Sequence, residues 1–175
     1  DNIERAITRA TAKGEGELAE VTYEGFAPGG VAVLVEAVTD NTNRTTSEVK
    51  SLFNKSGASF AAPGATSYKF QQAGEITVIK NEKSIDDIFM TAAELGASDI
   101  QDRDGEAAVY TDIPSLSKIK DGLIAAGIEV ARSEISRKPI NTVKIPDDIR
   151  EKIVNFLSAL EDMDDVQKVY SNISP

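Results

Sequence analysis

The sequence contains no histidine, no cysteine and no tryptophan. These absences exclude Ser-His-Asp and Cys-His nucleophilic sites, thiolate chemistry, disulfides, and zinc sites built from Cys or His. Long apolar runs are also missing, because the densest run, Val31 to Val35, is far shorter than the roughly 20 residues that span a bilayer. There is no basic-then-apolar leader or cysteine framework, so we expect a cytoplasmic protein or an organellar one after processing.

Positive charge is scarce. The 175 residues include 29 acidic and 19 basic side chains, which gives a net charge of −10, and each of the segments 1–75, 76–138 and 139–175 is net negative. Affinity for a phosphate backbone comes largely from Lys and Arg that displace counterions. A nucleic-acid role therefore needs a local basic face. The composition itself, 41% hydrophobic and 27% charged, is typical of one large or two small folded domains.

The N-terminal part of the chain predicts a helix followed by a hairpin. Residues 1–13 carry apolar side chains at helical spacing from the first residue on, which is typical of a fragment cut near a domain border. Two strand-like runs, 18–27 and 31–38, flank Pro28-Gly29-Gly30. This pattern predicts a hairpin whose tip holds glycines at positive φ.

A second helix is predicted over residues 45–56. Thr45 and Glu48 have the spacing of a capping box, and Val49, Leu52 and Phe53 form an apolar stripe. Residues 58–67 are expected to form a loop, and 67–72 a short strand.

From residue 75 the pattern alternates between strands and helices. We expect a strand at 75–80 and a helix capped by Ser84 that buries Ile85, Ile88, Phe89 and Ala92. Strands at 98–103 and 106–111 follow, joined by a turn at Asp104-Gly105. The segment closes with a helix over 116–126 and a strand over 128–135. This βαββαβ order is that of a ferredoxin-like domain.

The tail predicts a helix from Pro146 and a closing strand near residues 165–173. Neither element has a partner of its own. The predicted fold is therefore α+β with two domains: residues 1–73 plus 139–175 form one α+β domain, and residues 74–138 form a ferredoxin-like domain inserted into it.

Several short motifs resemble catalytic or binding patterns but lack residues that the chemistry requires. The segment Gly25 to Gly30 has phosphate-loop spacing but lacks the Lys and the Ser or Thr that bind phosphate and magnesium. The turn at Asp104-Gly105 lacks the carboxylates of a calcium loop at its first and last positions. The acidic residues at 161–165 suit a solvated helix end. We expect no cofactor, no metal and no catalytic residue, and hence no enzyme.

One set of basic residues is able to gather near one end of the first domain. Because phosphate contacts position a protein without specifying sequence, these side chains are the candidates for nucleic-acid binding. They are Arg5, Arg9, Lys13, Arg44, Lys50 and Lys55.

The run from Tyr23 to Gly57, YEGFAPGGVAVLVEAVTDNTNRTTSEVKSLFNKSG, closely resembles the YebC/PmpR family of probable transcriptional regulators. The tail LEDMDDVQKVYSNI and the opening DNIERAI are similar to the same family, so the resemblance covers essentially the whole chain. The residues that carry the family motifs are Gly25, Pro28, Gly29, Gly30, Asp40, Asn41, Arg44 and Thr45.

The resemblance implies a three-domain protein: a basic N-terminal helical domain, an α+β second domain, and a ferredoxin-like third domain inserted into the second. The first domain would be missing from this chain. The chain also departs from the family between Gly57 and Phe70, where members usually carry a more glycine-rich loop and a Trp. Here stand Ala58, Phe60, Ala61 and Tyr68.

The resemblance also implies a non-enzymatic regulator of gene expression. It would be a DNA-binding transcriptional regulator or a ribosome-associated translational activator, like mitochondrial relatives that resemble an activator of cytochrome oxidase. Its partner would be DNA, or ribosomal or messenger RNA, bound mainly by the full-length protein, with no membrane role. The alternative is a ligand-sensing or assembly module built on ferredoxin-like sheets, which a pocket at Asn41 and Asn43 would favour.

Overall fold

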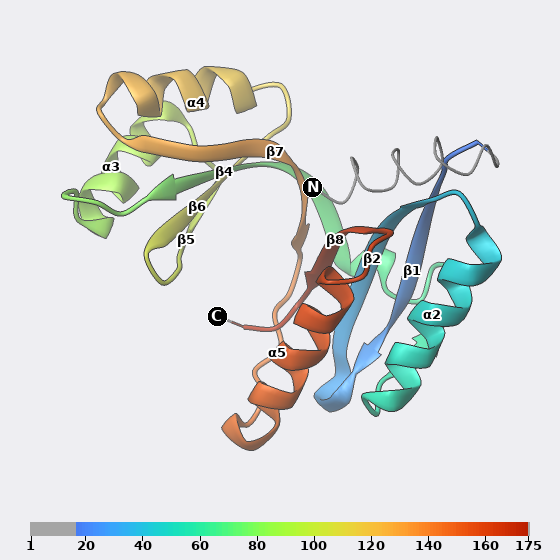
Figure 1. Ribbon diagram of the computed structural model, residues 1–175. Helices are drawn as coiled ribbons and strands as arrows, with labels where there is room; N and C mark the ends of the chain where they lie inside the picture. Colours follow the sequence, from blue (N-terminus) through green and yellow to red (C-terminus); the bar gives the residue numbers. More distant parts are fainter. Residues whose placement is uncertain (1–16, 175) are drawn as a thin grey trace. The chain divides into compact units, whose positions relative to one another are not determined.

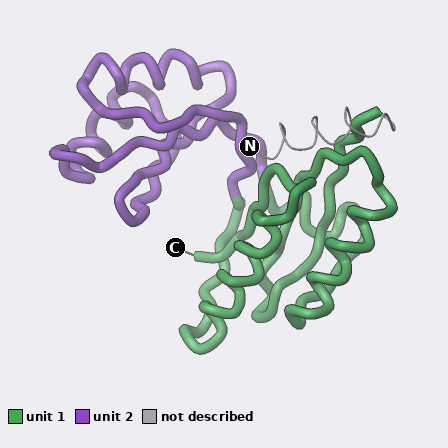
Figure 2. Tube along the Cα trace, in the orientation of Figure 1, with its two compact units in different colours: residues 1–70, 139–174 green, residues 71–138, 175 purple. Residues whose placement is uncertain are grey.

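The computed structural model describes residues 17–174, and these divide into two compact units (Figure 2). Among the described residues, unit 1 combines 17–70 with Pro139–Ser174, and unit 2 is Gln71–Lys138. For comparison, the sequence-based boundaries of the inserted domain are 74 and 138. The helix predicted over 1–13 lies outside the described residues.

Unit 1 is a four-stranded sheet with strand order β3-β1-β2-β8 and two helices, α2 and α5 (Figure 1). Its core lies between one face of the sheet and these helices. Its elements are β1 (Ala19–Ala27), β2 (Val31–Thr39), α2 (Thr42–Lys55), β3 (Ser59–Ala61), α5 (Asp147–Glu161) and β8 (Val166–Ser171).

The hairpin of β1 and β2 is confirmed, including its glycines. The strands pair antiparallel from Ala19 opposite Thr39 to Ala27 opposite Val31, and a turn at Pro28–Gly30 joins them. Gly29 and Gly30 have φ of 80° and 77°. A residue with a Cβ is strained in this left-handed region, so glycine is favoured at both positions.

Strand β2 is buried on both faces. Val31, Val33 and Val35 belong to the core beneath the helices, whereas Ala32 and Leu34 pack on the opposite face with Phe70. Every side chain from Val31 to Val35 is 0% exposed. A strand covered on both sides has a continuous apolar run rather than an alternating one, which is the pattern of this segment.

Gly25 lies where two other parts of unit 1 approach β1. A Cβ atom placed there would lie 2.3 Å from Phe53 Cε1 of α2 and 2.4 Å from the carbonyl oxygen of Ser59 in β3. Neither neighbour leaves space for a methyl group. Glycine at this position therefore allows α2 and β3 to pack against the sheet.

The tail of the chain completes the sheet of unit 1. β8 pairs antiparallel with β2, with Leu34 opposite Tyr170. Beyond the strand, Asn172 Oδ1 accepts a hydrogen bond of 2.8 Å from the backbone N–H of Ala32. These bonds join segments that are far apart in the sequence, and they give the tail helix and strand the partners they lack by themselves.

Unit 2 is a four-stranded sheet of order β5-β6-β4-β7. Helices α3 and α4 pack on one face around Ile88, Ile119 and Leu123. The element order and strand order are those of a split βαβ fold, so the predicted ferredoxin-like architecture is observed. Its elements are β4 (Phe70–Ile79), α3 (Ile85–Leu95), β5 (Asp99–Asp102), β6 (Glu106–Thr111), α4 (Leu116–Ala125) and β7 (Glu129–Pro139).

The start of α3 is as predicted, but one side chain of the helix that was predicted to be buried is exposed. Ser84 caps the helix and forms a capping box with Asp87. Phe89, predicted to be buried, is 54% exposed, because the helix packs against the core through Ile88 and Ala92, with Ile85 and Leu95 partly buried beside them. The packed stripe of this helix therefore continues to Leu95, and Phe89 lies beside the stripe.

Two local predictions between residues 58 and 72 were wrong. The expected loop contains a short strand, β3, which pairs with β1 so that Gly25 lies opposite Phe60. The expected strand begins only at Phe70, because Ser67–Lys69 form a 3-10 turn. Both errors arise from contacts with β1, which no local pattern reveals.

We expect Gly25→Ala to destabilise unit 1 more than Gly30→Ala. The added methyl at residue 25 would overpack Phe53 and β3 at a cost of about 2–3 kcal/mol. At residue 30 nothing lies within 4 Å of the new Cβ, so the cost is the strain of positive φ, about 1 kcal/mol. Urea unfolding of the two variants measures the difference, and equal midpoints would contradict the crowding at Gly25.

Candidate functional site

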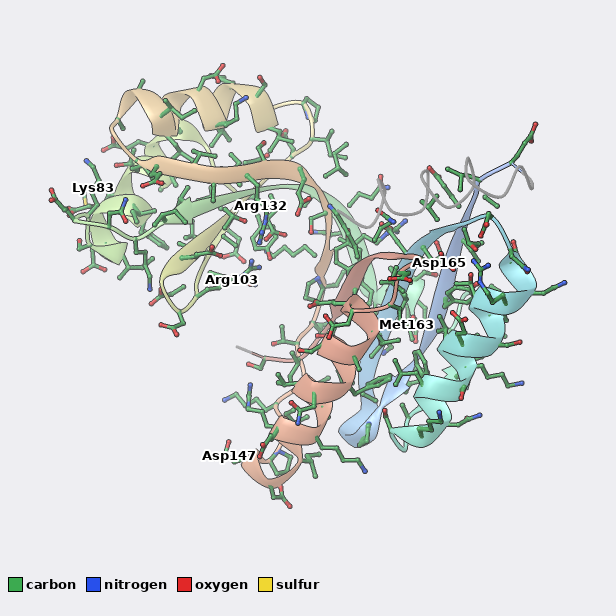
Figure 3. All side chains as sticks on the ribbon, viewed as in Figure 1. Lys83, Arg103, Arg132, Asp147, Met163 and Asp165 are labelled. Carbon is green, nitrogen blue, oxygen red and sulfur yellow. The ribbon has the colours of Figure 1, made fainter. Side chains whose placement is uncertain are left out.

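The segment that joins β2 to α2 forms a buried polar network around Asp165. This carboxylate lies just before β8 (Figure 3) and is 2% exposed. The hydroxyl of Thr45 lies 2.5 Å from Asp165 Oδ2, and that of Thr39 lies 3.2 Å from the same oxygen. The backbone N–H of Val38 donates to the Asp165 carbonyl at 2.8 Å. The network fixes the entry into α2 against the tail of the chain.

Arg44 belongs to this network. Its Nη2 atom lies 2.7 Å from Asp40 Oδ1 and 3.2 Å from Asp165 Oδ2. The hydrogen bond to Asp40 raises the pKa of the guanidinium above its ordinary value, and Asp165 adds to this effect. The charge of this candidate is therefore already matched by two carboxylates of its own chain.

The predicted N-terminus of α2 was wrong. The helix begins at Thr42 and is capped by Asn41, whose Oδ1 accepts a hydrogen bond of 3.1 Å from the backbone N–H of Arg44. Thr45 lies inside the first turn, buried towards Asp165, and does not cap the helix. The amide oxygen of Asn41 is therefore already used as the acceptor that caps the helix.

The two remaining lysine candidates lie on the outside of α2. Lys50 and Lys55 are both exposed. At the end of the helix, Lys55 lines an open groove together with Lys152 of α5, and the same groove also contains Asp148 and Glu151. The tertiary structure thus adds a lysine that sequence analysis did not single out, together with acidic neighbours.

The structure describes only three of the six basic candidates for nucleic-acid binding. Arg5, Arg9 and Lys13 lie outside the described residues. Of the other three, Arg44 is tied to Asp40 and Asp165, while Lys50 and Lys55 are exposed. The family-motif residues Gly25, Pro28, Gly29, Gly30, Asp40, Asn41 and Thr45 shape the hairpin and the start of α2.

A second feature that sequence analysis missed is a buried carboxylate that holds a loop. Glu24 of β1 is 5% exposed, and it accepts backbone hydrogen bonds from Gly64, Thr66 and Ser67 at 2.8, 2.6 and 2.9 Å. Burial alone raises the pKa of Glu24, but the hydrogen bonds from these three N–H groups outweigh it, so the pKa is lowered overall. Glu24 therefore anchors the loop between β3 and β4.

This loop carries an exposed aromatic side chain. Tyr68 is 67% exposed, and the Lys69 amine lies 5.2 Å from the centre of its ring. The neighbouring Phe70 is only 6% exposed. The loop thus presents a tyrosine and a lysine side by side from a fixed base.

The sheet face of unit 2 opposite its helices carries another polar network. Arg103 (Figure 3) donates to Glu75 Oε1 at 2.9 Å and to the Tyr110 hydroxyl at 3.0 Å. Lys138 lies 5.0 Å from the Tyr110 ring centre and 2.6 Å from Asp99. Burial raises the pKa of Tyr110 to about 12. This central tyrosine is covered and its neighbouring charges are paired.

Two further observations concern only residues 17–174. No group of three or more acidic side chains in this part of the chain is placed to hold a metal ion. No helix there is long and apolar enough to cross a bilayer.

Comparison with known proteins gives consistent matches along the chain. The family model described as TACO1/YebC second and third domain matches residues 18–173. A protein of Thermotoga maritima named a probable transcriptional regulatory protein is 47% identical over 174 residues, which is 98% of this chain and 68% of that protein. One of the same name from Aquifex aeolicus is 44% identical over 98% of this chain and 70% of its own length.

A solved structure supports the fold. The crystal structure of a conserved hypothetical protein from Aquifex aeolicus superposes with a TM-score of 0.84 at 40% identity. The superposition covers 98% of this chain and 77% of that one.

We expect Glu24→Gln to destabilise unit 1 by about 2 kcal/mol, because an amide oxygen cannot satisfy the three buried N–H groups and the new NH₂ faces donors. The matched control is Glu20→Gln, on the same strand and the same side of it but exposed. Urea unfolding, together with limited proteolysis of the 62–69 loop, distinguishes the two variants. Equal stability of both would contradict the anchoring role.

The lowered pKa of Glu24 also predicts that the protein loses stability in acid. Because its folded pKa lies below the ordinary value of 4.5, its hydrogen bonds contribute fully above that pH, and the contribution is lost as pH falls through the lower, folded value. Unfolding free energy measured between about pH 6 and pH 3 should therefore fall less steeply in Glu24→Gln than in the parent. Parallel curves would refute this assignment.

We expect Thr45→Val to lower the free energy of unfolding by about 1–2 kcal/mol, since the isosteric change removes the closest donor to the buried Asp165 carboxylate. Thr42→Val is the control, because Thr42 is exposed at the start of the same helix. Thermal or urea unfolding provides the comparison. A Thr45 variant as stable as the control would show that the network does not stabilise the fold.

Proposed function

Because this chain belongs to the TACO1/YebC family, we propose that it forms the second and third domains of a non-enzymatic regulator of gene expression that acts on nucleic acid. Unit 1 is the second domain and unit 2 is the third, inserted into it. The observation that carries the proposal is the match over 98% of the chain to relatives named probable transcriptional regulatory proteins.

The roles of the buried carboxylates support a non-enzymatic function. Glu24 accepts hydrogen bonds from its own loop, Asp165 from the start of α2, and Glu75 from Arg103. A general acid or base must reach a substrate. Each of these three carboxylates is instead directed at groups of its own chain.

The charge distribution limits how the chain binds nucleic acid. With a net charge of −10, electrostatic contact with a phosphate backbone needs local basic side chains, and the exposed lysines of α2, Lys50 foremost, are candidates for it. Such contacts position a protein on a phosphate backbone without reading sequence. Affinity should therefore be weak, salt-sensitive and independent of sequence.

Two targets are compatible with this function: promoter DNA, for a transcriptional regulator, and ribosomal or messenger RNA, for a translational activator. Crosslinking the full-length protein in cells and identifying the recovered nucleic acid decides between them. Recovery of DNA fragments supports the first target and recovery of RNA the second. Recovery of neither would overturn the proposal.

We expect the double variant Lys50→Glu/Lys55→Glu to bind duplex DNA and structured RNA several-fold more weakly than the parent at low salt. The slope of log affinity against log salt concentration should shrink by about 0.7–0.9 for each phosphate that the variant no longer neutralises. Titrations at two salt concentrations measure both quantities.

The control is Lys83→Glu/Lys118→Glu, which makes the same charge change at exposed positions of unit 2. It should retain most of the affinity. Equal reductions in the two double variants would mean that net charge alone, and not the face of α2, governs binding.

A further inference from the structure

The loop between β3 and β4, residues 62–69, is held at both ends. On one side, Glu24 accepts the backbone hydrogen bonds of Gly64, Thr66 and Ser67. The Thr66 hydroxyl lies 3.1 Å from both Glu24 Oε2 and the carbonyl oxygen of Val33, so it can donate to either. These bonds tie the loop to β1 and to the buried strand β2.

The far side of the loop is held equally well. The backbone N–H of Lys69 donates to the Thr66 carbonyl at 2.9 Å, and the Lys69 carbonyl accepts from the N–H of Ile140 at 2.9 Å. The next residue, Phe70, is buried against Ala32 and Leu34. The backbone of Tyr68 is thus fixed by neighbours on both sides before any partner binds.

Although its backbone is fixed, the side chain of Tyr68 is exposed to solvent. Among the large hydrophobic side chains exposed within residues 17–174, Tyr68 has the highest exposed fraction, 67%. The Lys69 amine lies 5.2 Å from the ring centre. An exposed aromatic ring on a fixed loop backbone contributes little to folding, so an external partner is the simplest reason for the arrangement.

The chemistry of the pair fits one partner class. Aromatic rings stack on nucleobases, and a cation beside them attracts the adjoining phosphate. A base inside a duplex has no free face, so the ring can stack only on an unpaired one. Because the backbone that carries the ring is already fixed, stacking costs little backbone freedom, which favours affinity.

We propose that Tyr68 is a stacking residue for an unpaired nucleobase, with Lys69 contacting the neighbouring phosphate. This inference rests on the proposed nucleic-acid function and deepens it by naming the kind of nucleic acid and the residue that recognises it. Lys69 occupies one face of the ring, and the base stacks on the other.

The remaining aromatic candidates do not offer such a site. Ferredoxin-like RNA-binding domains stack bases on aromatic side chains of their central strands, but Tyr110 on central strand β6 is only 3% exposed. Phe89 on α3 is 54% exposed, yet the first turn of its helix holds Asp86 and Asp87, and its last turn has no basic residue. Phosphate is repelled there, so Phe89 serves as the matched control.

The test uses the 175-residue chain with single-stranded oligonucleotides of about ten nucleotides, a length within the usual site size. RNA and DNA versions each carry one 5-iodouridine or its deoxy counterpart for photocrosslinking, or one 2-aminopurine for fluorescence. The chain has no tryptophan, so its own fluorescence does not interfere with that of 2-aminopurine. The variants are Tyr68→Ala, Tyr68→Phe and Phe89→Ala, each first checked for unchanged thermal unfolding.

We expect the photocrosslink to map to residue 68 and Tyr68→Ala to weaken binding about tenfold. Tyr68→Phe should retain affinity because it keeps the ring, and Phe89→Ala should behave as the parent. Binding of either the RNA or the DNA oligonucleotide supports stacking, and the difference between them identifies the preferred sugar.

Two results would overturn the inference and leave the proposed function intact. One is parental affinity in Tyr68→Ala. The other is binding of duplex or structured RNA through Lys50 and Lys55 with no binding of unpaired oligonucleotides, which would assign the Tyr68 loop to a protein partner instead. Failure to bind any nucleic acid, including by the full-length protein, would overturn the inference and the proposed function together.

Discussion

The burial of β2 on both faces is the constraint on which the rest of unit 1 depends. On one side its valines form the floor beneath α2 and α5, and on the other Ala32 and Leu34 receive Phe70 at the end of the anchored loop. A strand with two buried faces needs both layers present at once. For β2 these layers come from segments far apart in the sequence, so the fold of unit 1 cannot be assembled from its N-terminal part alone.

Two buried carboxylates fix further segments of unit 1 around this strand. Because an unpaired buried charge is costly, each carboxylate fixes the segment whose donors surround it. Glu24 thereby fixes the loop that carries Tyr68, and Asp165 fixes the start of α2 against the tail. In both cases residues whose chemistry resembles that of an active site serve to position exposed surfaces. These anchors agree with the non-enzymatic function proposed above.

Unit 2 shows why fold class alone does not locate a binding surface. Its strand order is that of ferredoxin-like domains, and RNA-binding domains of this fold use the open sheet face. Here Arg103 and Lys138 lie against Tyr110, and their charges are matched by Glu75 and Asp99. The exposed aromatic and the exposed lysine that the proposed function needs are both in unit 1, on the 62–69 loop and on α2.

The sequence by itself determined the elements whose signals are local. The positive φ at Gly29 and Gly30, the Ser84 cap, the βαββαβ order and the family could all be inferred, because turn chemistry, capping and periodicity depend on residues a few positions apart. Only the tertiary structure decided that Asn41 rather than Thr45 caps α2, that Phe89 is exposed, and that Glu24 and Asp165 are anchors. The physical reason is that these outcomes depend on which distant segment packs against the residue. Thr45, for example, donates its hydroxyl hydrogen bond to Asp165, which lies 120 positions further along the chain.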